Sequence, residues 1–411
     1  MTARVNRNGE HIPRSGSSIP INRVESVLGH TLSNGVAMRK SRKGFIIAAF
    51  LIVALVFIES PLLAAELSVR LENPPPGGNV HFVLFDSANT FGDLRDPVKV
   101  VKQPMDGRER YRIQNIPPGE YALLVFFDEN NNDRLDKNFI GIPNEPLGFG
   151  NQYQPKGPPS YQRAAFTLKK GESRAIDVTL NLPLGKRGRL GIGLGIIAQT
   201  SPYRDYKGGN FRAIPAIVYT GERVQIYGPR IQIGLGGSGN LRLAATGSYR
   251  IGAYKDSRSD YLTGMGNRKD TFLAGLTLNV ELPEGVDLST GYAHDVLDRI
   301  GGGEGSIKIG KAFQMGVFRF SPQIGLNWIS SELANHDFGV SSSKATPDRP
   351  QYKLDSIINL EGGVGLFIEI TRDWLVILNT SIELLDKDVI DSPIVSEDYI
   401  IKGLAVINYV F

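Results

Sequence analysis

Residues 318–328, with the sequence FRFSPQIGLNW, show the pattern that most clearly indicates the fold. Every second residue from Phe318 to Trp328 is apolar, whereas the residues between them are polar or glycine. Successive side chains of a β-strand point to opposite faces, so this strand has one apolar and one polar face. About ten residues is also the length that a tilted strand needs to cross a membrane. The stretch therefore predicts a strand with lipid on one side and a polar interior on the other.

The same alternation recurs through residues 187–411, for example in 190–196, 272–282 and 360–370. We count eleven strand candidates, and the segment 223–236, broken by Gly228-Pro229, is long enough for two strands. Lipid leaves no partner for unpaired backbone groups, so the sheet must close on itself. Since bacterial single-chain barrels have even strand numbers, we predict a transmembrane antiparallel β-barrel of about twelve strands, with ten as the alternative.

The chain ends inside a predicted strand, with Ile407, Tyr409 and Phe411 on one face. A terminal phenylalanine preceded by apolar or aromatic residues at every second position resembles the signal read by the outer-membrane assembly machinery. Aromatic residues also fall near other strand ends, as membrane interfaces favour; they include Phe272, Trp328 and Trp374. Outer-membrane lipid and the assembly machinery are therefore expected partners.

Residues 38–65 are predicted to be a secretory signal peptide. A basic segment, 38–43, precedes an apolar run, 45–58, and small residues stand before Glu66. The run is short for the alternative, a transmembrane anchor. Residues 1–37 are polar and without periodicity, which indicates a start codon assigned too early, with a long regulatory leader as the alternative.

Charge and cysteine content exclude some classes of function. Residues 1–43 hold eight of the 46 Lys and Arg residues, and the chain from Glu66 onward is close to neutral. The positive charge therefore belongs to the export region, and no nucleic-acid partner is expected. The chain has no cysteine, so disulfides and thiolate chemistry are excluded.

Residues 66–183 are predicted to be a seven-stranded β-sandwich, because short strand-like runs alternate with Pro- and Gly-rich turns. The predicted strands are 67–72, 79–86, 98–102, 111–114, 121–128, 164–169 and 174–182. The turn at 116–121, IPPGEY, precedes a core strand and resembles the transthyretin-like sandwich superfamily. Barrels of this kind begin on the periplasmic side, so we expect the sandwich in the periplasm.

The stretch 128–136, DENNNDRLD, carries oxygen side chains with the spacing of a calcium loop. Asp128, Asn130, Asn132 and Asp136 occupy the first, third, fifth and ninth places of such a loop. The sixth place, usually glycine, is Asp133, and the twelfth, usually glutamate, is Phe139. A calcium site and an Asx-rich hairpin loop without metal both stay open.

The wider segment 127–151 is similar to an uncharacterised family of exported sandwiches that repeats an Asp-x-Asn-x-Asn-x-x-Leu-Asp motif and a Gly-x-Pro-x-Glu-Pro motif. Both motifs are present here, the second as Gly141 to Pro146. The resemblance covers most of residues 66–182 and implies no established activity.

Residues 190–411 resemble the MipA/OmpV family of outer-membrane proteins. The segments that carry the resemblance are 215–221, 295–305, 322–328, 337–341, Tyr352, 391–395 and 409–411. The family implies a non-enzymatic scaffold that links murein-synthesising and murein-degrading machinery, with a lytic transglycosylase and a penicillin-binding protein as partners. Other family members are known only as stress-responsive envelope proteins. The fused sandwich is outside the usual family pattern.

Two other functions are weighed against a scaffold. A lipid-modifying barrel enzyme needs a serine within reach of a histidine that an acid orients; His294 and His336 each precede an aspartate, but no serine motif accompanies them. We therefore expect no catalytic residues. A small pore is the other alternative, since Arg319, Glu361 and Glu369 are predicted to face inward, where they either line a channel or pair across a plugged lumen.

Overall fold

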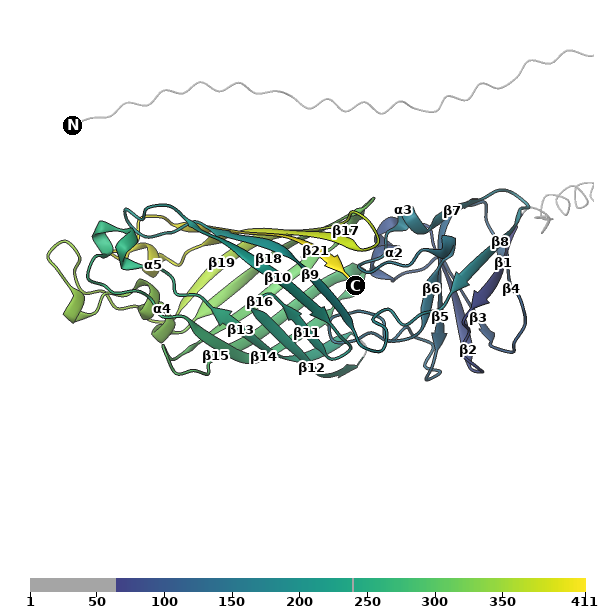
Figure 1. The fold of residues 1–411 in the computed structure, drawn as a ribbon, viewed down its shortest axis with the longest axis horizontal. Coiled ribbons are helices and arrows are strands. Elements are labelled where there is room, and N and C mark those ends of the chain that lie inside the picture. Colours follow the sequence, from purple (N-terminus) through teal and green to yellow (C-terminus); the bar gives the residue numbers. More distant parts are fainter. Residues whose placement is uncertain (1–63, 239) are drawn as a thin grey trace, which may run out of the picture. The chain divides into compact units, whose positions relative to one another are not determined.

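The computed structural model of the protein describes residues 64–238 and 240–411. The predicted leader, and all but the last two residues of the predicted signal peptide, lie outside these residues. Within them, no helix is both long enough and apolar enough to cross a membrane. The described chain is all-β, with two small sheets between Ala65 and Thr179 and one large sheet between Arg189 and Val410 (Figure 1).

The two small sheets make the sandwich. The first has the order β4 (Tyr111–Ile116), β1 (Ala65–Glu72), β8 (Ser173–Thr179). The second has the order β3 (Lys99–Pro104), β2 (Asn79–Phe85), β5 (Gly119–Asp128), β6 (Leu147–Phe149), and β7 (Ala165–Leu168) also pairs with β5. All seven predicted strand segments are present, and the three-residue strand β6 adds an eighth.

The second sheet is buried on both faces. Val80 and Phe82 of β2 pack into the core between the two sheets. Val83 and Phe85 pack into another core on the opposite face, together with residues of α2 (Ala88–Asp93) and α3 (Tyr161–Ala164). A strand covered on both faces can be apolar at every position, which accounts for the unbroken run ALLVFF in β5.

The large sheet closes into a barrel of twelve antiparallel strands. It closes because β16, at one edge of the sheet, also pairs with β18 at the other edge. The strands are β9 (Arg189–Gln199), β10 (Asn210–Thr220), β11 (Val224–Tyr227), β12 (Arg230–Ser238), β13 (Leu241–Arg250), β14 (Thr271–Glu281), β15 (Val286–Asp295), β16 (Gly303–Lys311) continued by β17 (Phe313–Met315), β18 (Phe318–Ile329), β19 (Ile357–Glu369), β20 (Trp374–Leu384) and β21 (Tyr399–Val410). The segment 223–236 does hold two strands, with a turn at Gly228-Pro229. The prediction of twelve strands is confirmed.

The apolar face of the wall points outward. Leu194, Leu276 and Ile324 are each at least half exposed, as expected of side chains that meet lipid. The long loops, such as 330–356, all lie at one end of the barrel, whereas short turns, such as 221–223 and 370–373, join the strands at the other end. Short turns face the periplasm in outer-membrane barrels, so the barrel begins and ends on the periplasmic side.

Aromatic residues gather at both rims of the barrel. Trp374 packs edge-on against Tyr409, with ring centroids 5.4 Å apart, at the end with the short turns. The ring centroids of Tyr292 and Trp328 lie 6.2 Å apart at the end with the long loops. Both sets occupy strand ends, where the amphipathic rings favour the two membrane interfaces.

Candidate functional site

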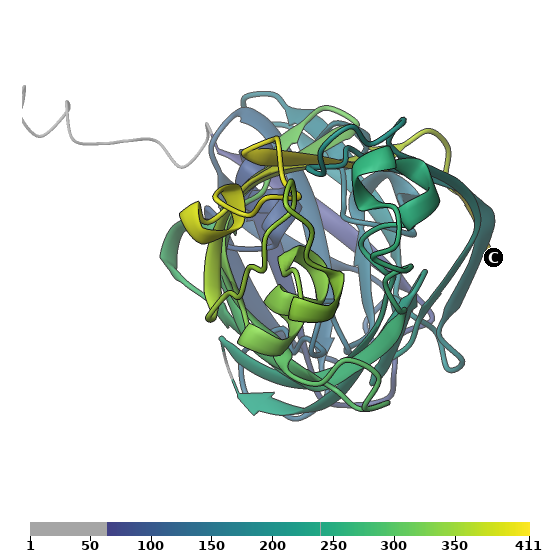
Figure 2. The same ribbon diagram turned by 90° about the vertical axis from the view of Figure 1, so that its left-hand side faces the viewer.

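The long outer loops pack on one another and build a hydrophobic core of their own. Its buried residues include Tyr203, Tyr254, Leu262, Leu333 and Phe338, the last two from α4 (Ser331–Phe338). Figure 2, which faces this end of the barrel, shows loop segments folded across the opening. The outer end is therefore covered by packed protein.

A buried ion network ties the loop core to the wall. Arg250, the last residue of β13, donates through Nη2 to Asp337 at 2.7 Å and through Nε to Glu304. The Nδ1 atom of His336 lies 2.8 Å from Asp337 Oδ1. Burial by itself would raise the pKa of Asp337, but Arg250 and His336 outweigh it and lower that pKa to about 2. The network holds α4 over the barrel opening.

The histidines considered for catalysis have structural partners. His336 Nε2 accepts the backbone N–H of Lys269 at 3.2 Å, and His294 Nδ1 lies 3.1 Å from the hydroxyl of Tyr292. Within residues 64–238 and 240–411, no hydrogen bond joins either histidine to a serine hydroxyl. The serine–histidine pair that a lipid hydrolase needs is not assembled by these contacts.

Charged side chains on the inner face of the barrel pair along its wall, between strands that lie next to one another or one strand apart. Lys308 of β16 donates to Glu361 of β19 at 2.9 Å, and Asn327 of β18 donates to the same carboxylate at 2.8 Å. Farther along the wall, Lys402 of β21 donates to Glu383 of β20 at 2.6 Å. Because these contacts run along the wall, both arrangements that the sequence left open for Glu361 stay open.

The sandwich meets the periplasmic end of the barrel through ion pairs. Glu281, the last residue of β14, lies 2.8 Å from Arg95 and 3.7 Å from Lys137, both of the sandwich. It also accepts from Arg242 of the neighbouring barrel strand at 2.9 Å. The Glu281 carboxylate thus links Arg95 and Lys137 of the sandwich to Arg242 of the barrel wall.

Two further predicted inward-facing residues have partners in the sandwich. Arg319 of β18 pairs with Asp93 at the end of α2. Glu369, at the end of β19, accepts from Arg163 at 3.0 Å and from the Tyr153 hydroxyl at 2.9 Å. A cavity of about 840 Å³ remains between the two parts, so the junction is ionic and incompletely packed.

The predicted calcium residues lie together in one loop. The amide nitrogens of Asn130 and Asn132 both donate to the Asp136 carboxylate, at 2.6 and 3.1 Å. Asp128, fully buried, accepts the backbone N–H groups of Asn132 and Asp133 at 3.1 and 2.9 Å. Amide nitrogen and oxygen exchange places by a side-chain flip, so the same residues can turn oxygens toward one point.

Two features of this loop could not be predicted from the spacing of its oxygen side chains in the sequence. Asp133, which replaces the usual glycine, has a φ of 60°, a conformation that aspartate tolerates better than most residues. Glu145 accepts the backbone N–H groups of Glu129 and Asp136 at 3.1 and 3.0 Å and so closes the loop. Burial raises the pKa of Glu145 to about 7. The Gly-x-Pro-x-Glu-Pro motif was the only sequence signal for this residue.

The predicted assembly signal lies along β21. Ile407 is 42% exposed and Phe411 is 64% exposed, and the Tyr409 ring packs between Trp374 and Phe411. The backbone N–H of Phe411 donates to Leu190 of β9, so the last residue joins the strand at which the barrel begins. Recognition by the assembly machinery stays a prediction.

Residues 192–411 match the family described as MltA-interacting protein MipA. Residues 72–176 match a family described as uncharacterized protein conserved in bacteria, DUF2141, so the transthyretin-like resemblance stays a prediction. The MltA-interacting protein of Escherichia coli (strain K12) is 26% identical over 231 residues, which are 52% of this chain and 86% of the relative.

A second relative is the outer membrane protein Omp26La of Vibrio anguillarum, 29% identical over 152 residues. The aligned part is 36% of this chain and 59% of Omp26La, less than two thirds of that protein. The first family match covers more than half of the chain. This outer-membrane β-barrel protein therefore belongs to the MltA-interacting protein MipA family.

Proposed function

We propose that the protein is a non-enzymatic scaffold of the outer membrane that links murein-degrading and murein-synthesising enzymes. Its proposed partners are a lytic transglycosylase and a penicillin-binding protein. The name of the Escherichia coli relative, MltA-interacting protein, supports a partner of the first kind. The family match lies in the barrel, so the barrel is the part to which this proposal applies.

The packed loop core at the outer end of the barrel is the observation that carries the proposal. A conducting barrel needs a continuous aqueous path, but the outer loops have a core in which Leu333 and Val389 are fully buried. Below this core, Lys308 and Glu361 pair on the inner face of the wall, one strand apart. The packed loop core suits a rigid membrane anchor better than a channel.

The sandwich adds a periplasmic domain that the matched MipA region lacks. Since it binds the barrel through Arg95, Lys137 and Arg163, it covers part of the surface that a periplasmic partner would otherwise meet. We propose that partners of this chain contact the sandwich, so they need not be identical to those of relatives without it.

Crosslinking of the full-length protein in native envelopes tests the scaffold. We expect one lytic transglycosylase and one penicillin-binding protein among the crosslinked products. Asp337→Asn, which alters only the outer loops, should leave this recovery unchanged because the partners are periplasmic. Steady single-channel conductance of the refolded protein, with neither enzyme crosslinked, would replace the scaffold with a pore.

We also propose that the loop 128–136 binds calcium. The gathering of Asn130, Asn132 and Asp136 around one point supports this, since calcium prefers several oxygen ligands at about 2.3–2.6 Å. Calorimetric titration of the full-length protein should show calcium binding that Asp136→Ala removes. The absence of heat at millimolar calcium would end this proposal.

A further inference from the structure

We propose that His81, Asp128 and Asp133 form a second metal site, specific for a borderline divalent cation such as zinc. The three residues come from different parts of the sandwich: β2, the end of β5 and the loop that follows β5. In β2 and β5, His81 pairs with Phe126 and Asn79 pairs with Asp128. Asp128 is therefore a diagonal neighbour of His81 on the same face of the sheet.

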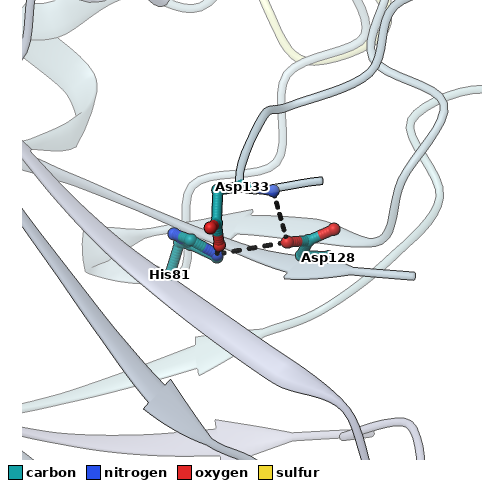
Figure 3. A group of neighbouring side chains, drawn as sticks. All are labelled: His81, Asp128 and Asp133. Carbon is teal, nitrogen blue, oxygen red and sulfur yellow. Dashed lines mark hydrogen bonds and ion pairs between the residues drawn. The ribbon is translucent and has the colours of Figure 1, made fainter. Parts of the chain in front are cut away.

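The distances suit one ion bound by all three side chains (Figure 3). The Nε2 atom of His81 lies 3.4 Å from Asp128 Oδ2 and 3.5 Å from Asp133 Oδ1. Ligands on a tetrahedral zinc ion, with bonds of about 2.0–2.1 Å, stand ~3.3 Å apart. The three ligand atoms all lie within 4.8 Å of one another, so small side-chain shifts complete the geometry.

His81 is the observation that points to a ligand. The residue is only 4% exposed, and its Nε2 atom makes no hydrogen bond within the described residues. A buried polar atom without such a partner is costly. Its ring stacks on Phe126, with centroids 4.7 Å apart and an interplanar angle of 7°, which aims Nε2 at the two carboxylates.

Asp128 is held in place for this role by its own hydrogen bonds. Its carboxylate is fully buried and accepts two backbone N–H groups, those of Asn132 and Asp133. Such outer contacts orient a metal-binding carboxylate and keep it ionised. The oxygen that accepts from Asp133, Oδ2, also faces His81, so a cation at this point would neutralise a buried negative charge.

Lys102 is the natural competitor of the metal. It lies opposite His81 on the neighbouring strand β3, and its ammonium group pairs with Asp133 Oδ1. A positive charge there weakens cation binding. The side chain of Lys102 is 40% exposed and that of Asp133 is 61% exposed, so the lysine can turn into solvent when a metal replaces it. Water would complete the coordination on this open side.

The ligand chemistry separates this site from the proposed calcium loop. Calcium takes only oxygen ligands, whereas an imidazole nitrogen favours zinc and its neighbours among the transition metals. The two sites share Asp128 but differ in every other ligand: His81 and Asp133 belong to this site, and Asn130, Asn132 and Asp136 belong to the calcium loop. Substitutions at the unshared residues therefore distinguish the two ions.

Calorimetric titration of zinc into the full-length protein, folded in detergent and free of any histidine tag, tests the site. We expect one zinc ion per chain. His81→Phe keeps the ring stack but removes the nitrogen, so it should weaken zinc binding at least about tenfold, as should Asp133→Asn. Lys102→Met should strengthen binding severalfold because it removes the competing charge, a gain that misfolding cannot imitate.

His294→Phe and Asp136→Ala serve as matched controls. The first removes a histidine outside the site and the second alters the calcium loop, so both should bind zinc as the parent protein does. Cobalt in place of zinc should give a visible absorption band that His81→Phe abolishes. Equal zinc affinity of the parent and His81→Phe, or weaker binding by Lys102→Met, would overturn the proposal. Loss of zinc binding in Asp136→Ala alone would place the ion in the calcium loop instead, and would also overturn the proposal.

Discussion

The barrel wall and the sandwich use the same two-residue alternation with opposite results. In the sandwich, Leu123 of β5 is completely buried between the two sheets. In the barrel, Leu276 of β14 is 51% exposed on the outer face. Both residues lie in regular antiparallel strands, and only the solvent differs. A strand puts its apolar face toward whatever is least like water, which is the protein core in one region and lipid in the other.

Charged pairs also lie on opposite sides of the sheet in the two regions: outside in the sandwich and inside in the barrel. Arg70 and Asp177 of the sandwich pair on its surface, with side chains 42% and 29% exposed. Lys308 and Glu361 of the barrel pair inside, with side chains 32% and 12% exposed. Loss of one partner costs more stability in an interior pair than in a surface pair, because the remaining charge is poorly solvated. The comparison predicts that equal substitutions have unequal effects in the two regions.

The largest difference is expected from the loss of one charge. Glu361→Ala leaves Lys308 and Asn327 without their acceptor, so it should lower the free energy of unfolding by about 4 kcal/mol. Asp177→Ala on the sandwich surface should cost less than about 1 kcal/mol. Urea unfolding in detergent measures the cost of Glu361→Ala, since both tryptophans of the chain lie in the barrel and report its unfolding. Similar costs for the two variants would mean that the barrel interior is as well hydrated as the surface.

Deletion of apolar volume should have the next largest effect. Leu123→Ala removes a fully buried side chain and should destabilise the sandwich by about 3 kcal/mol, because it leaves a cavity. Leu276→Ala should cost the barrel much less, since lipid or detergent chains fill the space. Hydrogen exchange of peptides from β5 and β14 measures the two effects separately. A larger cost at Leu276 than at Leu123 would contradict the assigned outward face of β14.

Local patterns were sufficient to predict most of this architecture from sequence. Alternation, turn residues and strand length are properties of neighbouring residues, so the barrel strands and the turn at Gly228-Pro229 were predicted correctly. The three-residue strand β6 and the short helix α2 were not predicted. Elements of this length carry too few residues for a periodic signal, and tertiary packing around Phe91 and Phe149 stabilises them.

The parts that the sequence did not reveal depend on contacts between distant residues. Arg250 and Asp337 are 87 positions apart, and Arg163 and Glu369 are 206 apart. His81 lies within the predicted strand 79–86, but nothing in the local spacing places Asp128 and Asp133 beside it. Asp133 departs from the calcium pattern in the sequence, whereas in the fold it faces the histidine.

Acid should affect the outer loops more than the sandwich surface, with the smallest of the three effects. Arg250 and His336 keep the pKa of buried Asp337 near 2, below the value of about 3.9 expected when the loop is unfolded. The ionised form of Asp337 is therefore favoured in the folded loop, and this stabilisation is complete above pH 4. It falls as the pH drops from 4 to 2, by about 2 kcal/mol, because the unfolded loop binds the proton first.

Hydrogen exchange of α4 across this range, in the parent and in Asp337→Asn, measures the change. The variant should show no such step; if its α4 loses protection over the same range as that of the parent, another group of the loop core is responsible.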